Sequence, residues 1–128
     1  MDLIRVPHEN LPSIRAYGDG GFRIAGEHYA GAVLVHPDGI CPLGLTGPAD
    51  FDEAFAREIA DLDPRPDLLL VGMGESIAPL ADDARRVLRD AAVSVEIMGT
   101  GPACRTFNVL LGEGRRVAAV LLPIPRST

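Results

Sequence analysis

The chain has 128 residues, of which 47% are hydrophobic, and its formal net charge is -6. This length is typical of one domain with its own core, and the hydrophobic content excludes a disordered chain. An acidic chain lacks the basic surface that a general nucleic-acid-binding protein needs, so we expect no nucleic-acid partner. All 12 basic residues are arginine, which excludes Schiff-base chemistry and a Walker-type phosphate-binding lysine.

Cysteine and histidine usage favours a protein without a bound metal. Cys41 and Cys104 lie far apart in the chain, and the 3 histidines are scattered. The sequence therefore predicts neither a metal site nor any other cofactor, and it favours a reducing cytoplasm. The first ten residues carry Asp2 and Glu9 without an apolar segment, unlike a signal or transit peptide. No apolar run approaches the ~20 residues of a membrane helix, so we expect a cytoplasmic protein without a membrane span.

The amino-terminal part of the chain has the pattern of strands and turns. Ile14–Tyr17 and Phe22–Ala25 flank a cluster of glycines and Asp19 that can supply the positive φ angles of a hairpin turn. A third apolar run, Ala32–Val35, ends at a second turn signal that begins at His36. We therefore expect antiparallel strands before residue 48.

After residue 48 the pattern alternates between helices and short apolar strands. Asp50 is the expected cap of the first helix, with Glu53 completing a capping box, and Pro79 is expected in the first turn of the second helix. A third helix is expected from about 100–102 to 112–114. The expected strands are 67–71, 93–97 and 117–122.

Alternation of this kind predicts an α/β fold, in which strands 67–71 and 93–97 lie parallel in one sheet. We expect one domain over residues 1–128, with three layers, a central mixed sheet covered by helices, and antiparallel amino-terminal strands. Ligands of open α/β sheets collect at the carboxyl ends of parallel strands. The loops 72–79 and 98–102 are therefore the expected place of a functional cleft.

Several motifs around these loops resemble one protein family. The match begins with a glycine-bearing strand end and continues through E-x-M-x-T, A-x-R-T-F-N and a Glu-Gly-Arg turn. Its residues are Gly72, Gly74, Glu96, Met98, Thr100, Ala103, Arg105, Thr106, Phe107, Asn108, Glu113 and Arg115, together with the early YGDGGF hairpin at 17–22. The sequence resembles the domain family that includes mitochondrial respiratory complex I assembly factor 3, an adipogenesis-associated animal protein and many bacterial homologues. The resemblance implies a three-layer fold and a role in assembling respiratory membrane complexes.

The turn around Gly72, Gly74 and Glu75 has two interpretations. Backbone N–H groups between a strand and a helix can hold an anion, and Glu96 lies where a ribose-binding acid would follow. A dinucleotide fingerprint requires a third glycine, however, and Ile77 occupies that position. The favoured interpretation is a tight strand-to-helix turn.

Arg105, Thr106 and Asn108 are expected in the first turns of the third helix, beside the same loops. A guanidinium, a hydroxyl and an amide group can together bind a carboxylate or phosphate. Alternatively, Arg105 ties the loops together by pairing with Glu75 or Glu96, while Asn108 satisfies backbone groups. We expect Arg105 at the mouth of the cleft, opposite an anion.

The remaining candidates have simpler explanations. Cys104 lies near a helix N-terminus, which can activate a thiol, but its apolar neighbours favour a buried core residue without a catalytic role. Glu113 and Arg115 flank a turn, where an ion pair or a partner contact would explain them. No pair of acids has the pattern of a general acid and base.

Two hypotheses for function follow. The favoured hypothesis is a non-enzymatic binding or assembly-support protein with a protein partner, since no catalytic constellation is evident. The alternative is an enzyme or sensor that binds a small anionic or nucleotide-like ligand in the cleft. A pocket with a trapped anion would favour the second hypothesis, and a broad apolar patch would favour the first.

Overall fold

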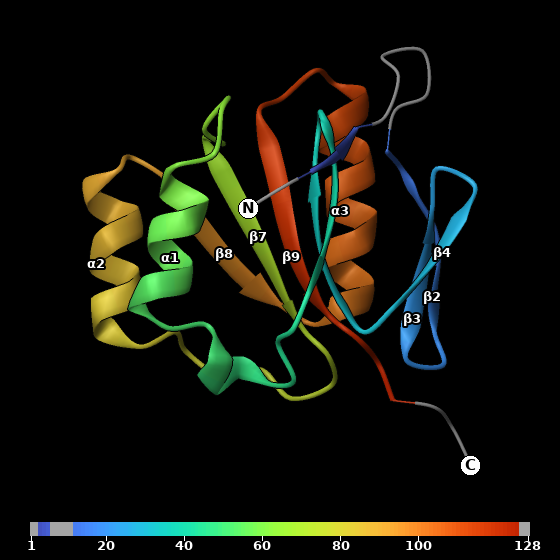
Figure 1. The fold of residues 1–128 in the computed structure, drawn as a ribbon, viewed down its shortest axis with the longest axis horizontal. Helices are drawn as coiled ribbons and strands as arrows, with labels where there is room; N and C mark the ends of the chain where they lie inside the picture. The colour runs from blue at the N-terminus through green and yellow to red at the C-terminus, as the bar shows by residue number, and fades with distance from the viewer. Residues whose placement is uncertain (1–2, 6–11, 126–128) are drawn as a thin grey trace.

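The computed structural model describes residues 3–5 and 12–125 (Figure 1). Within these residues the chain forms strands, three α-helices and one short 3-10 helix. The strands are β1 (Ile4–Arg5), β2 (Ile14–Gly18), β3 (Gly21–Ile24), β4 (Glu27–Ala30), β5 (Ala32–His36), β6 (Gly39–Leu43), β7 (Leu68–Met73), β8 (Ser94–Met98) and β9 (Val117–Leu122). The helices are η1 (Pro48–Asp50), α1 (Glu53–Ala60), α2 (Asp82–Asp90) and α3 (Thr100–Gly112).

The strands form two sheets. The larger sheet has six strands in the order β1-β6-β5-β9-β7-β8, and the smaller has the order β2-β3-β4. In the larger sheet β7 runs parallel to both β8 and β9, whereas β5 pairs antiparallel with β6 and β9. The predicted parallel pair of strands 67–71 and 93–97, and the shared sheet with 117–122, are therefore confirmed.

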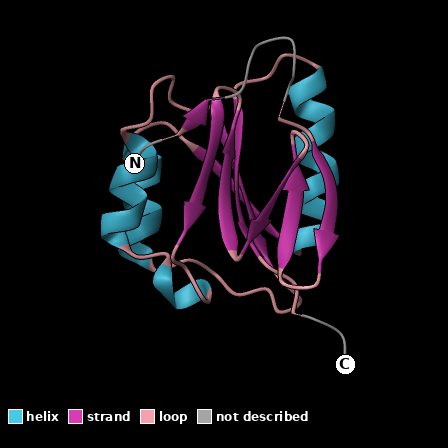
Figure 2. Cartoon of the chain, turned by 45° about the vertical axis from the view of Figure 1, so that its right-hand side comes forward, coloured by secondary structure: helices cyan, strands magenta, loops and turns pink. Residues whose placement is uncertain are grey.

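Helices cover both faces of the six-stranded sheet, which gives the expected three layers (Figure 2). Leu69 and Val71 of β7 point into a core shared with α1 and α2. Leu70, between them, points into a second core shared with α3 and the small sheet. A strand buried on both faces has the continuous apolar sequence that predicted β7.

The hairpin expected around Asp19 is confirmed as the β2–β3 pair, in which Tyr17 lies opposite Phe22. Strands β1, β4 and β6 were not identified from the sequence. Their patterns are weak because β1 has only two residues, β4 is largely exposed and Pro42 interrupts β6.

Two predicted helix starts are wrong. Asp52, and not Asp50, caps α1, since its carboxylate accepts a hydrogen bond of 2.9 Å from the backbone N–H of Phe55. The Asp50 carboxylate instead accepts hydrogen bonds from the backbone N–H and hydroxyl of Thr46 and from the Gly47 N–H, which lower the pKa of that carboxyl. Helix α2 begins at Asp82, so Pro79 lies in the preceding loop.

No helix in residues 3–5 and 12–125 combines the length and apolar character needed to cross a membrane. The longest, α3, has 13 residues.

Candidate functional site

The carboxyl ends of β7 and β9 meet the first turn of α3 through Thr100, which is fully buried. Its hydroxyl accepts a hydrogen bond of 2.8 Å from the Gly74 N–H and donates one of 2.6 Å to the carbonyl of Leu122. The Thr100 N–H donates to the Gly74 carbonyl at 3.1 Å. Thr100 therefore joins α3 to the ends of both strands. Its hydroxyl proton is donated to the Leu122 carbonyl.

The two glycines of this turn have separate structural roles. A Cβ atom on Gly72 would lie 3.0 Å from the Cα of Thr100 and 3.1 Å from the Cβ of Ala103. The missing side chain thus lets α3 pack directly on β7. Gly74 has a φ of +68°, a conformation that favours glycine. These contacts describe the tight strand-to-helix turn that was the favoured interpretation of the sequence.

Arg105 lies on the side of α3 that faces the small sheet. Its Nη1 donates a hydrogen bond of 3.2 Å to the hydroxyl of Tyr17 on β2. Among the described residues, Arg105 forms no ion pair with Glu75 or Glu96, so the alternative in which such a pair ties the two loops together is not present. Both carboxylates are exposed on other segments. The guanidinium is exposed and has an uncharged partner, and its positive charge therefore faces solvent.

Tyr17 also fits closely against the helix, because a Cβ atom on Gly101 would lie 2.7 Å from the Tyr17 hydroxyl. The sequence pattern places Tyr17 in the hairpin and does not predict its contact with α3. Tyr17, Gly101 and Arg105 form one contact between β2 and α3, which are distant in the sequence.

Asn108 joins α3 to the same strand, three residues further along the helix. Its Oδ1 accepts a hydrogen bond of 2.8 Å from the Ile14 N–H, and its Nδ2 donates one of 2.9 Å to the Ile14 carbonyl. The side chain therefore satisfies both backbone groups of one β2 residue. This contact agrees with the alternative in which Asn108 satisfies backbone groups.

The other candidates do not gather at one place. Glu96 is exposed on β8, Met98 is half-buried at the end of that strand, and Thr106 is half-buried on α3. Glu113 and Arg115 are exposed in the turn between α3 and β9, at the opposite end of α3 from the loops 72–79 and 98–102. The structure thus brings together the candidates at 72, 74 and 100, and separately joins Arg105 and Asn108 to β2.

Cys104 is buried, as predicted, with 2% of its surface exposed. Burial raises the pKa of its thiol to about 12, and the nearby Arg105 charge only partly offsets that effect. His36 belongs to the other face of the sheet, since it alternates with Val35, which packs in the core around Cys104. The His36 Nε2 lies 2.8 Å from the Pro64 carbonyl, and its Nδ1 accepts a hydrogen bond from Asp38. This environment keeps the thiol protonated at neutral pH.

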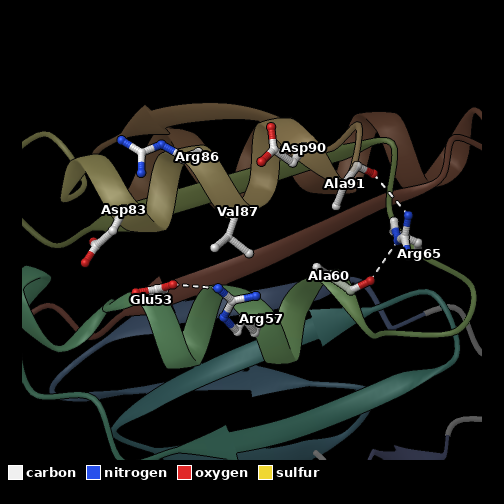
Figure 3. A pocket seen from close by; sticks show the side chains of 9 residues that line it. All are labelled: Glu53, Arg57, Ala60, Arg65, Asp83, Arg86, Val87, Asp90 and Ala91. Atoms are coloured by element: carbon white, nitrogen blue, oxygen red, sulfur yellow. Dashed lines mark hydrogen bonds and ion pairs between the residues drawn. The ribbon is translucent and has the colours of Figure 1, made fainter.

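Three pockets are lined by described residues away from the loops. One, of about 450 Å³, lies between α1 and α2, where Arg57 pairs with Glu53 and Arg65 donates to the carbonyls of Ala60 and Ala91 (Figure 3). Another, of about 290 Å³, lies in the β2–β3 hairpin beside His28. The third, of about 590 Å³, lies between α2 and β8. None of the three pockets was predicted from the sequence.

The protein is therefore a three-layer α/β domain in which polar residues of the motif join distant elements. The chain belongs to a family of proteins of unknown function, DUF498/DUF598, whose model matches residues 14–122. It is 45% identical over 112 residues to an uncharacterised protein of Rhodobacter capsulatus, with 88% of this chain and 85% of that protein covered. It is also 30% identical to mouse NADH dehydrogenase [ubiquinone] 1 alpha subcomplex assembly factor 3, over 100% of this chain and 69% of that protein.

Solved structures share this fold. A Bordetella pertussis protein described as an Mth938-like domain superposes with a TM-score of 0.81 at 29% identity, covering 99% of this chain and 95% of its own. A Bartonella henselae protein described as an outer membrane protein has a TM-score of 0.80 at 36% identity, covering 89% of this chain and 98% of its own. Family membership and the α/β fold are therefore established.

Proposed function

We propose that this chain is a non-enzymatic binding protein that supports the assembly of a respiratory membrane complex. The observation that carries the proposal is its similarity to the mouse assembly factor along the whole of this chain, at 30% identity. The chain would act from the cytoplasm as a single domain and would bind a protein partner.

The contacts of the family motif support a binding role over a catalytic one. Thr100, which is buried, and Asn108, which is half-buried, are committed to backbone hydrogen bonds. The Cys104 thiol is buried and protonated at neutral pH. The charged candidate residues, by contrast, are exposed, as contacts with a partner require. They are Glu75, Glu96, Arg105, Glu113 and Arg115.

Deleting the gene in the source organism tests this proposal. We expect the membranes to contain less assembled complex I on native gels and to oxidise NADH with quinone more slowly. The gene for the wild-type chain should restore both, whereas an Arg105→Gln variant should restore them less well than the matched surface variant Arg57→Gln. Normal complex I in the deletion strain would refute the assembly role.

A second candidate function is the binding of a small anion at Arg105. It is favoured by the exposed guanidinium, whose recorded partner is the uncharged Tyr17 hydroxyl. Titration of the chain with inorganic phosphate or a dicarboxylate, followed by amide NMR shifts around residue 105, tests this function. Saturable shifts that Arg105→Gln abolishes would support it, and unchanged spectra would exclude these anions as ligands.

A further inference from the structure

Within residues 3–5 and 12–125, strand β8 forms one edge of the six-stranded sheet and pairs with β7 alone. In this parallel pair Ser94 lies opposite Leu68, and the Ser94 N–H donates to the Asp67 carbonyl at 2.9 Å. The backbone groups of alternate residues point to the same side of a strand. Those of Glu96 therefore also face β7, and those of Val95 and Ile97 face the open edge.

The backbone groups of Val95 and Ile97 have no hydrogen-bond partner in the part of the chain that the structure describes. An edge of this kind is a template for another strand unless the protein covers it. The small sheet shows how this chain covers an edge, because Asn108 binds both backbone groups of Ile14 on the outer side of β2. No side chain does the same for β8 among the described residues.

The face of β8 next to α2 carries a positive pocket. This pocket, of about 590 Å³, is lined by Arg85 and Arg89 of α2 and by Ala92, Val93, Ser94 and Val95. Arg85 has only a distant ion pair of 3.9 Å with Asp82, and Arg89 has no recorded partner within the described residues. The pocket therefore combines two exposed guanidinium groups with apolar walls. It would accept an acidic side chain from a strand lying beside β8.

We propose that the β8 edge binds an extended segment of a partner protein, which adds a strand to the sheet and places an acidic side chain against Arg85 and Arg89. The main-chain hydrogen bonds to Val95 and Ile97 would supply affinity, and the arginines would select the acidic partner. This inference rests on the proposed function as a binding protein and names the class of its partner.

A second copy of this chain fits the edge less well. An antiparallel pair of β8 strands that uses both open residues of each copy places Val95 opposite Ile97 and Glu96 opposite Glu96. Two like charges directly opposite each other destabilise a strand pair. An acidic segment from a different protein avoids this repulsion and gains the attraction of Arg89.

Synthetic peptides test the inference with the full chain. The probe is an eight-residue peptide of alternating valine and threonine with one central glutamate, and its control carries lysine at that position. We expect the glutamate peptide to bind saturably, with amide NMR shifts confined to α2 and β8, and the lysine peptide to bind about tenfold more weakly. Equal binding of both peptides, or shifts outside α2 and β8, would overturn the proposal.

Two pairs of variants sharpen this test. Val95→Pro removes an N–H that makes no hydrogen bond within the sheet, so the chain should fold while peptide binding falls at least about fivefold. Val95→Ala, which loses similar packing but keeps the N–H, should bind within about twofold of the wild type. Arg89→Glu should reverse the preference toward the lysine peptide, and Arg86→Glu on another face of α2 should not. Loss of binding in Val95→Ala equal to that in Val95→Pro would refute strand addition.

Sedimentation and the deletion strain separate the remaining outcomes. A dimer of the chain that Val95→Pro dissolves would show that a second copy occupies the edge, and it would overturn the acidic-partner proposal. If Val95→Pro restores complex I fully in the deletion strain, the edge proposal fails and the assembly role stands. If the deletion leaves complex I unchanged while the glutamate peptide binds as expected, the assembly role fails and the edge proposal stands.

Discussion

The layer of α3 and the small sheet contains side-chain hydrogen bonds between segments that are distant in the chain, whereas the layer of α1 and α2 is held mainly by apolar packing. Asn108 and Ile14, which are 94 residues apart, meet in the first layer. In the second layer, the core residues of α1 and α2 include Phe55, Ile59 and Leu88. Three polar residues of the family motif, Thr100, Arg105 and Asn108, belong to α3.

The comparison teaches that much of this family's motif specifies a scaffold. A helix held by apolar packing tolerates changes that preserve volume and pattern, because any hydrophobic side chain of similar size serves. A hydroxyl or amide that satisfies particular backbone groups has few substitutes. The hydroxyl of Thr100 and the amide of Asn108 therefore identify the fold strongly.

Thr100→Val is the largest expected loss of stability. The substitution leaves the Gly74 N–H and the Leu122 carbonyl buried without their partner, and we expect the free energy of unfolding to fall by ~3 kcal/mol. Urea unfolding measures the change. Thr106→Val is the matched control, since the hydroxyl of Thr106 has no recorded hydrogen bond among the described residues, and it should change stability by less than ~1 kcal/mol. Equal effects would contradict the fastening role of Thr100.

Asn108→Leu should destabilise the protein by ~2 kcal/mol, because both backbone groups of Ile14 then depend on solvent for hydrogen bonds. Amide hydrogen exchange should become faster mainly in β2. Arg105→Leu, one turn earlier on the helix, should cost less than ~1 kcal/mol because its hydrogen bond to Tyr17 is exposed. A larger loss for Arg105→Leu would mean that Arg105 is the main anchor of the small sheet.

Arg65→Gln tests the other layer and should cost ~1 kcal/mol. The guanidinium of Arg65 donates to the carbonyls of Ala60 and Ala91, near the C-terminal ends of α1 and α2, where a positive charge is favourable. Arg57→Gln removes an exposed ion pair with Glu53 and should cost less than ~0.5 kcal/mol. If Arg65→Gln cost as much as Thr100→Val, hydrogen bonding would be equally important in both layers.

Local pattern was sufficient to predict much of the fold. Short apolar segments predicted β7, β8 and β9, and their alternation with helices predicted the parallel pair of β7 and β8. The start of α1 was predicted wrongly because two neighbouring acids, Asp50 and Asp52, each have the sequence pattern of a helix cap. The separation of β2, β3 and β4 into their own sheet depends on packing against α3, which leaves no periodic signal.

The candidate site was harder to predict because its contacts cross large distances in the chain. The motif identified Thr100, Arg105 and Asn108 as important, but their partners Leu122, Tyr17 and Ile14 followed only from the tertiary structure. The alternative in which Arg105 pairs with Glu75 or Glu96 is absent for the same reason, since proximity to a loop does not determine which side of a helix faces it. Burial of Cys104, by contrast, follows from the apolar pattern of its own helix.

Cys104 gives the smallest expected effect at neutral pH and a defined effect at high pH. Its thiol pKa rises from 9.0 to about 12, mainly through burial, so the folded chain keeps a proton that the unfolded chain loses in this range. The resulting stabilisation is present below the lower value and is lost as pH rises toward the higher one. We therefore expect the difference in unfolding free energy between wild type and Cys104→Ala to be constant from about pH 6 to 8 and to shift against the wild type above about pH 9.

Thiol labelling of the folded wild type at neutral pH should be slow, because the thiolate is the reactive form. Rapid labelling of Cys104 that slows under mildly acidic conditions would instead identify an activated thiol, and it would place chemistry in the layer that we describe as a scaffold.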